Sequence, residues 1–391
     1  MSLFNILHSF LLEVFFSRLG YFVKKLTLKL FAMKKKLLLF LGVLCYFTFY
    51  SCSKNKVRDA ETVVKGAHIE SNAAACGCEP ADTGIFDPTC LVAPKAELKK
   101  LGEGFSFTEG PAVDKQGNIF FTDQPNDKIY KWSANTGAIT TFLTGTGRSN
   151  GMAFDKDGNL IACADMHGEL WKIAPNGNHT VLVNNYKGKL LNGPNDVWIN
   201  PKNGGMYITD PIFPRGYWDA GDPRRQEWPP THSEQAKIGK GGYVYYLAPG
   251  SRTLVRVTTE AMGWDADGWP NGVVGTPDGK KLYINKWAPD INTAGTWVFD
   301  IKPNGTLTNM RKFIDMGGDG MSMDERGNIY ISNSYGVTAF DPNGTRIFNV
   351  PTGGGATNNV FGGNNNKTLF ITGPVDQLTS LKMNVKGVEK W

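Results

Sequence analysis

Six segments of the chain carry a carboxylate or an amide side chain at the same place, a few residues before a turn that contains glycine. Carboxylate and amide oxygens are hard ligands, and they suit Ca²⁺ or Mg²⁺ better than thiolates and imidazoles do. Two carboxylates among neutral amides would nearly balance a divalent charge. The pattern therefore predicts a site for a divalent cation, Ca²⁺ first, with Mg²⁺ or Zn²⁺ as alternatives. The six residues are Glu109, Asn150, Asn195, Asn271, Asp319 and Asn358.

A simpler interpretation is that these Asn and Asp residues occupy turns, where their side chains bond the local backbone. That interpretation suffices for any one position. Six positions in register, two of them acidic, favour a binding site. Asn150 and Asn358 are the weakest members of the set and could simply line a channel.

An Asp-x-x-Gly-Asn turn followed by an apolar run recurs and identifies the elements that must position these residues. Close copies occupy 114–118, 155–159 and 324–328, and looser copies begin near residues 200, 277 and 363. Each copy is typical of a hairpin, and a second hairpin follows in most repeats. The turn glycines at 117, 158, 205, 279 and 327 are separated by 41, 47, 74 and 48 residues. Apart from the third gap, this is the length of one four-stranded propeller blade.

The spacing predicts an all-β fold over residues 95–391, a six-bladed β-propeller with four-stranded blades around a central channel. A β-sandwich with chance similarity among its turns is the alternative. Equivalent positions in a propeller are related by its pseudo-symmetry axis, so the six oxygen-bearing side chains would converge at one end of the channel. The long gap contains an insertion at 214–241, which we expect to lean over the channel mouth and shape a substrate pocket.

The N-terminal residues 1–52 have the order of an export leader. A basic segment starting at Met33, the expected true start, precedes an apolar run at 37–50 that ends at Cys52. The ending resembles a bacterial lipobox, although Phe49 stands where Leu is preferred. We expect export to the bacterial periplasm or cell surface as a lipoprotein anchored at Cys52, with residues 53–94 as a polar tether. An ordinary signal peptide and an uncleaved anchor are the alternatives.

The cysteines and the net charge indicate which disulfides, metals and partners to expect. Cys76 and Cys78 lie close to Cys90 in the tether, where a disulfide from either one to Cys90 is expected and a soft-metal site is the alternative. Cys163 lies in an apolar run and is expected to be buried.

After residue 52 the chain carries 35 basic and 35 acidic residues, which argues against nucleic-acid binding. We expect a monomer that meets the membrane only through its lipid.

Three motifs together resemble the gluconolactonases of the regucalcin/gluconolactonase superfamily. They are Phe107-Thr-Glu-Gly-Pro111, Leu191-Asn-Gly-Pro-Asn-Asp-Val197 and Tyr207-Ile-Thr-Asp-Pro211. Pro270-Asn-Gly272 and Gly318-Asp-Gly-Met321 extend the likeness, which covers roughly residues 98–390. The resemblance implies a six-bladed propeller that binds one divalent cation and hydrolyses a lactone.

The resemblance also implies roles for single residues. The family's metal ligands fall on Glu109, Asn271 and Asp319, its metal- or substrate-contacting Asn on Asn195, and its catalytic acid/base on Asp319. The sequence departs from the pattern at Gly193, where regucalcin-like members have an Arg, and in the bulky segment from Trp264 to Trp269 before Asn271.

Six oxygen-bearing side chains around one cation could hydrolyse a lactone, which is a cyclic ester. A cation would polarise the carbonyl and hold the oxyanion, and Asp319 would activate water as a general base. Asn195, Asn150, Asp196 and His167 are candidates to bind a small-molecule lactone; a surface turn residue is the alternative for His167. Two other classes stay open: a strictosidine-synthase- or arylesterase-like propeller enzyme, and a non-catalytic binding propeller.

Overall fold

The computed structural model describes residues 87–211, 213, 242–264, 269–287, 294–373 and 377–389. The predicted leader, its Cys52 and the insertion at 214–241 lie outside these residues. Among the described residues, no helix is long and apolar enough to cross a membrane.

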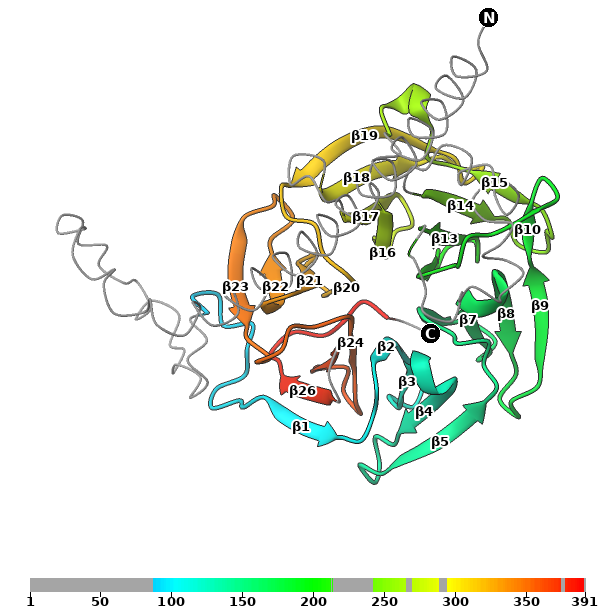
Figure 1. The fold of residues 1–391 in the computed structure, drawn as a ribbon. Coiled ribbons are helices and arrows are strands. Elements are labelled where there is room, and N and C mark those ends of the chain that lie inside the picture. Colours follow the sequence, from blue (N-terminus) through cyan, green and yellow to red (C-terminus); the bar gives the residue numbers. More distant parts are fainter. Residues whose placement is uncertain are drawn as a thin grey trace, which may run out of the picture. The chain divides into compact units, whose positions relative to one another are not determined.

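The described chain forms six four-stranded antiparallel sheets arranged around an axis, as Figure 1 shows in a view along that axis. Each sheet is one blade, with its first strand innermost. The strands of blades 1 to 3 are β2 (Thr108–Val113), β3 (Ile119–Asp123), β4 (Lys128–Trp132), β5 (Ile139–Thr144), β6 (Met152–Phe154), β7 (Leu160–Ala164), β8 (Glu169–Ile173), β9 (His179–Val183), β12 (Val197–Ile199), β13 (Met206–Asp210), β14 (Tyr243–Leu247) and β15 (Leu254–Arg256). Those of blades 4 to 6 are β16 (Trp269–Gly275), β17 (Lys281–Trp287), β18 (Gly295–Ile301), β19 (Leu307–Ile314), β20 (Met321–Met323), β21 (Ile329–Asn333), β22 (Gly336–Phe340), β23 (Arg346–Val350), β24 (Asn359–Gly362), β25 (Thr368–Thr372), β26 (Leu378–Lys382) and β1 (Lys99–Gly102).

The remaining elements are short connections. A small hairpin of β10 (Asn185–Tyr186) and β11 (Lys189–Leu190) follows blade 2. Single turns of 3₁₀ helix occupy η2 (Gln124–Asn126), η3 (Asp165–His167) and η5 (Glu260–Met262). The predicted six-bladed all-β propeller is thus confirmed.

The ring is closed by pairing the two ends of the described chain. The sheet of blade 6 runs β1-β26-β25-β24, so its outermost strand comes from the N-terminal end and its other three strands from the C-terminal end. Lys99 lies opposite Ser380 in this pairing. The pairing of β1 with β26 therefore ties the first blade to the last one, and the blades surround the channel without a gap.

The recurring Asp-x-x-Gly-Asn segments are the turns between the first and second strands. In blade 1, Asp114 Oδ1 accepts the Asn118 backbone N–H at 2.9 Å, and Asp114 Oδ2 accepts Asn118 Nδ2 at 2.7 Å. The same pair of contacts joins Asp324 to Asn328. The turn glycine Gly117 has φ +79°, a conformation that glycine adopts without a steric penalty.

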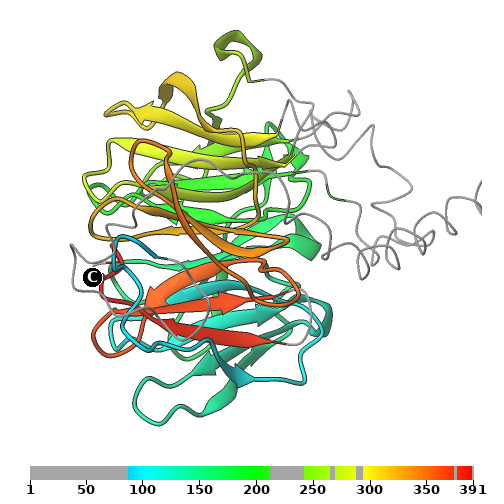
Figure 2. The same ribbon diagram turned by 90° about the vertical axis from the view of Figure 1, so that its left-hand side faces the viewer.

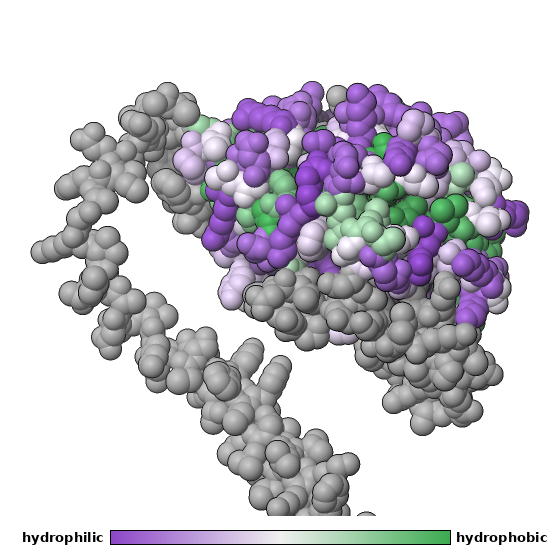
Figure 3. Space-filling view, turned by 90° about the horizontal axis from the view of Figure 1, so that it is seen from above, coloured by the Kyte–Doolittle hydropathy of each residue, from purple (hydrophilic) through white to green (hydrophobic). Residues whose placement is uncertain are grey.

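The core lies between the blades. The second strands are almost completely buried, because each is covered on both faces by neighbouring blades. Outer strands such as β5 and β9 consist mostly of exposed and partly buried residues. Figure 2 shows the blades from the edge of the ring, and Figure 3 shows hydrophilic residues over much of one side with a smaller apolar area among them.

Two cysteines lie among the described residues. Cys163 on β7 is free and buried, as predicted. Cys90 is disulfide-bonded, and because Cys163 is free its partner lies outside the described residues. A disulfide at Cys90 agrees with the predicted staple, while the choice between Cys76 and Cys78 stays a prediction.

Candidate metal centre and active site

A β-bulge at the start of each inner strand positions the candidate ligands. In blade 2, Asn150 N–H donates to the Cys163 carbonyl, and Cys163 N–H donates to the Gly151 carbonyl, so two residues lie opposite one. Blades 3 and 5 repeat this at Asn195 and Asp319. In blades 1 and 4 the strand register shifts at the same place, between Glu109 and Ala112 and between Pro270 and Val273. A bulge turns a side chain out of the regular alternation of a strand, and here it does so at the predicted site residues.

The six bulges touch one another and so define one level of the channel. Gly151 N–H donates to the Asn195 carbonyl at 2.6 Å, and Gly272 N–H donates to the Asp319 carbonyl at 3.1 Å. A Cβ on Gly110 would lie 1.9 Å from the Asn150 carbonyl oxygen of the next blade. In blades 1, 2, 4 and 5 the residue after the ligand position is therefore a glycine, because a Cβ there would collide with the next blade. Glu109, Asn150, Asn195, Asn271 and Asp319 lie at this level, each on a different blade.

Blade 6 departs from the predicted set by one residue. Thr357 N–H donates to the Thr372 carbonyl, and Thr357 accepts the Gly320 N–H from blade 5, which are the contacts of a ligand position. Asn358 therefore stands where the other blades have Gly110 or Gly151, and the prediction that Asn358 is the sixth equivalent residue is wrong. The amide at 358 resembles the rest of the predicted set, whereas the equivalent residue, Thr357, has neither an amide nor a carboxylate.

Asn358 still reaches the site, because its side chain contacts Glu109. Glu109 is 3% exposed, and its Oε2 accepts Gly110 N–H at 2.8 Å and Asn358 Nδ2–H at 3.2 Å. The amide of Asn358 is fixed in turn, since its Oδ1 accepts the Asn359 N–H at 2.8 Å. Asn358 thus orients the carboxylate of the predicted ligand.

Asp196 lies beside the ring and joins two blades. Its Oδ1 accepts the Val197 N–H at 2.9 Å, and its Oδ2 accepts the Val273 N–H of blade 4 at 3.2 Å. Burial raises the pKa of Asp196 to about 8; the backbone N–H bonds lower this pKa, and the negative charge of Glu109 raises it further. Glu109 thus affects the pKa of Asp196 although the two residues belong to blades 1 and 3.

The remaining predicted residue, His167, lies away from the ring. It ends η3, the turn between β7 and β8, and its side chain is exposed. The imidazole stacks on Trp171 with ring centroids 5.8 Å apart, and Trp171 stacks in turn on His179 of the outer strand β9. Because β7 runs toward the end of the channel where β6 begins, His167 shares the face of the ring but lies among the outer strands.

Two buried aspartates that were not predicted as site residues hold the segments before the ligands. Asp210, at the end of β13, accepts the backbone N–H groups of Asn192 and Gly193 at 3.1 and 3.0 Å. Asp123, at the end of β3, accepts the N–H of Phe107 at 3.2 Å. The repeated Thr-Asp at the end of these strands is the sequence signal that could have identified them.

Blade 4 has Lys286 at the place of these aspartates. The side chain is 1% exposed, and its Nζ lies 5.3 Å from the ring centroid of the buried Trp264, within the range of a cation–π contact. Trp264 Nε1–H donates to the Gly242 carbonyl at 3.2 Å. Lys286 is adjacent to the ligand strand, because it pairs with Pro270, the residue before Asn271.

The donor chemistry of the ring fits a divalent cation with oxygen ligands. Glu109, Asn271 and Asp319 offer carboxylate and amide oxygens, which suit Ca²⁺ or Mg²⁺. Within the described ranges, no cluster of three or more His, Cys, Asp or Glu side chains forms a metal site, so the donor set is a mixed one that depends on amides.

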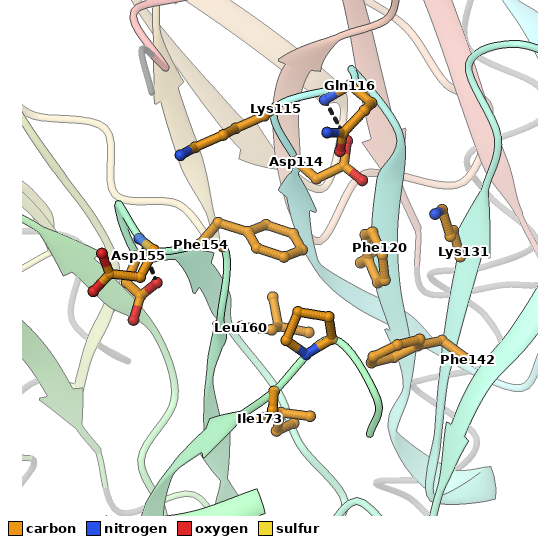
Figure 4. A pocket seen from close by; sticks show the side chains of 14 residues that line it. Asp114, Lys115, Gln116, Phe120, Lys131, Phe142, Phe154, Asp155, Leu160 and Ile173 are labelled. Atoms are coloured by element: carbon orange, nitrogen blue, oxygen red, sulfur yellow. Dashed lines mark hydrogen bonds between the residues drawn. The ribbon is translucent and has the colours of Figure 1, made fainter. Parts of the chain in front are cut away.

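A cavity of about 510 Å³ lies between blades 1 and 2, at the opposite end of the strands from the ring. Figure 4 shows Phe120, Phe142 and Phe154 on its floor and the turn carboxylates of Asp114 and Asp155 on its rim. Those carboxylates accept hydrogen bonds from their own turns. The cavity is therefore a groove between packed blades, and none of the predicted site residues lines it.

The fold and the ring together define a family. Residues 107–373 match the model of the SMP-30/Gluconolactonase/LRE-like region, and the chain belongs to this family. It is similar to a gluconolactonase of Zymomonas mobilis, with 28% identity over 305 residues that cover 70% of this chain and 78% of that protein.

Solved structures agree with this assignment. A gluconolactonase of Xanthomonas campestris is 26% identical with a TM-score of 0.63, covering 78% of this chain and 96% of that one. A calcium-binding regucalcin of Agrobacterium tumefaciens shares the fold at 19% identity, with a TM-score of 0.56 over 74% of this chain and 94% of that one.

Proposed function

We propose that this protein is a cation-dependent lactonase that opens a sugar lactone to its hydroxy acid. Lactonase-type hydrolysis is the activity that the family and the gluconolactonase relatives support. The proposal assigns one Ca²⁺ to Glu109, Asn271 and Asp319, with Asn195 reaching the cation or the substrate. The observation that carries it is the set of bulges that brings two carboxylates and three amides from five blades to one level of the channel.

Each residue has a distinct task in the proposed reaction. A bound divalent cation would polarise the lactone carbonyl and stabilise the oxyanion. Asp319, which is only half-buried, accepts a proton from the water whose oxygen adds to the carbonyl carbon. The ring C–O bond then breaks, and Asp319 returns that proton to the departing oxygen, which becomes a hydroxyl group. Asn150 offers its amide to the substrate, while Asp196 acts indirectly by holding blade 4 against blade 3.

Three variants test the assignment. Asp319→Asn removes the basic oxygen and keeps an oxygen that can still bind a cation, so it should retain part of the Ca²⁺ affinity and lose turnover by about 10²–10⁴-fold. Glu109→Gln should weaken Ca²⁺ binding, with activity partly recovered at high Ca²⁺. Asn195→Ala should raise KM if it holds substrate, or resemble Glu109→Gln if it binds the cation.

The measurements are Ca²⁺ titration by calorimetry and pH-stat rates on a panel of aldonolactones, with and without added metal. Wild-type turnover by Asp319→Asn would remove the general base from the proposal. A wild-type protein that binds no divalent cation would overturn the site as a whole, and a protein that binds the cation but hydrolyses no lactone would have a binding role.

A further inference from the structure

An aromatic stack lies at the rim of the channel beside Asn271. Trp269 and Trp287 are cross-strand partners on β16 and β17, with ring centroids 4.7 Å apart and planes 22° apart. Phe213, which follows blade 3's strand β13, packs on Trp269 at 5.7 Å. The two indoles are therefore stacked, and Phe213 lies tilted against Trp269 at 37°.

The stack lies just outside the level of the proposed cation site. Trp269 precedes Asn271 by two residues, and Trp287 follows Lys286, the partner of Pro270. At a rise of about 3.3 Å per residue, the Trp269 Cα is roughly 7 Å from that of Asn271 along the strand. Because β16 begins and β17 ends at the end of the propeller where the proposed ligands lie, both indoles stand at that end of blade 4.

One face of the stack is open to solvent. Trp287 is 46% exposed, whereas Trp269 and Phe213 are partly buried beneath it. An exposed indole that is held flat by a second indole loses little conformational freedom when a ligand covers it. The stack is thus a rigid apolar platform at the rim, a form suited to contact with one flat face of a ligand.

We propose that this platform binds a second sugar ring of the substrate, so that the enzyme acts best on aldonolactones that carry a glycosidic substituent. A pyranose has an apolar face of C–H groups and a polar edge of hydroxyls. On an open platform the C–H face covers the indole while the hydroxyls stay in water. An alkyl or aromatic tail has no polar edge and gains most from an enclosed pocket, which a half-exposed indole is not.

The sugar-binding platform rests on the proposed lactonase function, and the experiments below can refute either one without the other. The substrates are glucono-δ-lactone, which has one ring, and cellobiono-δ-lactone, which has a second glucose ring. The wild type should have a lower KM for the two-ring lactone. Trp287→Ala should raise the KM for cellobiono-δ-lactone about tenfold, which corresponds to the loss of a contact of about 1.4 kcal/mol. The kcat and the KM for gluconolactone should change little. Trp287→Phe should restore part of the difference.

The matched control is Trp132→Ala. Trp132 is also a partly buried indole in a ring contact, with Phe370 at 4.7 Å, but it lies where β4 ends, at the opposite end of the propeller. This variant should leave the preference for the two-ring lactone intact. If Trp287→Ala raises KM equally for both lactones, or if the wild type does not prefer the two-ring lactone, the platform does not bind a sugar. A stronger effect of Trp287→Ala on dihydrocoumarin, an aromatic lactone, would overturn the choice of a sugar.

A binding experiment tests the platform even if neither sugar lactone is hydrolysed. Cellobiose, which has no lactone, should quench tryptophan fluorescence in the wild type and not in Trp287→Ala. Binding without hydrolysis would refute the lactonase function and uphold the platform. Hydrolysis of gluconolactone without any cellobiose binding would uphold the lactonase function and refute the platform.

Discussion

Replacing Asn358 by Ala tests how the predicted ligand Glu109 is oriented. Glu109 Oε2 receives hydrogen bonds from the Gly110 N–H at 2.8 Å and from Asn358 Nδ2 at 3.2 Å. Both side chains are buried, with 3% and 7% exposure, so the lost bond is not easily replaced by bulk water. A hydrogen bond to a charged group contributes about 1.5–3 kcal/mol, and the length of this one places it at the lower end.

The expected result is a Ca²⁺ dissociation constant about tenfold higher in Asn358→Ala, since about 1.4 kcal/mol corresponds to a factor of ten. Loss of a residue that orients a metal ligand commonly costs 10–100-fold in affinity, which agrees with this value. Because Asn358 does not take part in the proton transfers, kcat at saturating Ca²⁺ should stay near that of the wild type. Calorimetric titration gives the first quantity and pH-stat rates the second.

Asn359→Ala is the matched control for this experiment. Asn359 is the adjacent buried amide, and it donates to the Tyr330 carbonyl and to Ser332 Oγ of blade 5. Its loss should lower the melting temperature and leave the Ca²⁺ dissociation constant unchanged. Equal weakening of Ca²⁺ binding by both variants, or no change in Asn358→Ala, would refute the orienting role of Asn358.

Three further predictions concern the ring, the C-terminal segment and the leader. Gly272→Ala should lower stability by about 1–3 kcal/mol in thermal melts, because its Cβ would lie 2.4 Å from the Asp319 carbonyl oxygen; an unchanged melting temperature would contradict the close approach. Burial raises the pKa of Glu389 from 4.5 to about 7, so wild-type stability should fall as pH rises between these values, and Glu389→Gln should flatten that fall in urea titrations. Intact-mass analysis of membrane-extracted protein should find lipidated Cys52 as the N-terminus, and any other N-terminus would exclude the anchor.

The blades could be predicted because their signals are local. Asp114 and Asn118 lie four residues apart and bond each other directly, so the turn is visible in a short stretch of sequence. The same turn recurs once per blade, and the count gives the number of blades. The closure of blade 6 by β1 could not be predicted in the same way, because Lys99 meets Ser380 across nearly the whole ring and no local pattern specifies that pair.

The site was predicted as far as the repeat specifies it. Glu109, Asn150, Asn195, Asn271 and Asp319 follow from their place before the turns and lie at one level of the channel. Thr357 was missed because a threonine among amides gives no chemical signal, and because the amide of Asn358, one residue later, resembles the rest of the set. The contacts of Asn358 with Glu109, and of Asp196 with Val273, join different blades and become visible only when the ring is assembled.

The arrangement also explains why the ring needs its closure. The three proposed ligands come from blades 1, 4 and 5, and the amide that orients Glu109 comes from blade 6. Blade 6 is completed by β1, which immediately precedes blade 1 in the chain. A break in the β1–β26 pairing would therefore loosen the contact between Asn358 and Glu109 before it reached Asn271 or Asp319. A cation that binds only the closed ring stabilises the ring by an amount set by its affinity and concentration, so ring closure and the proposed cation binding would reinforce each other.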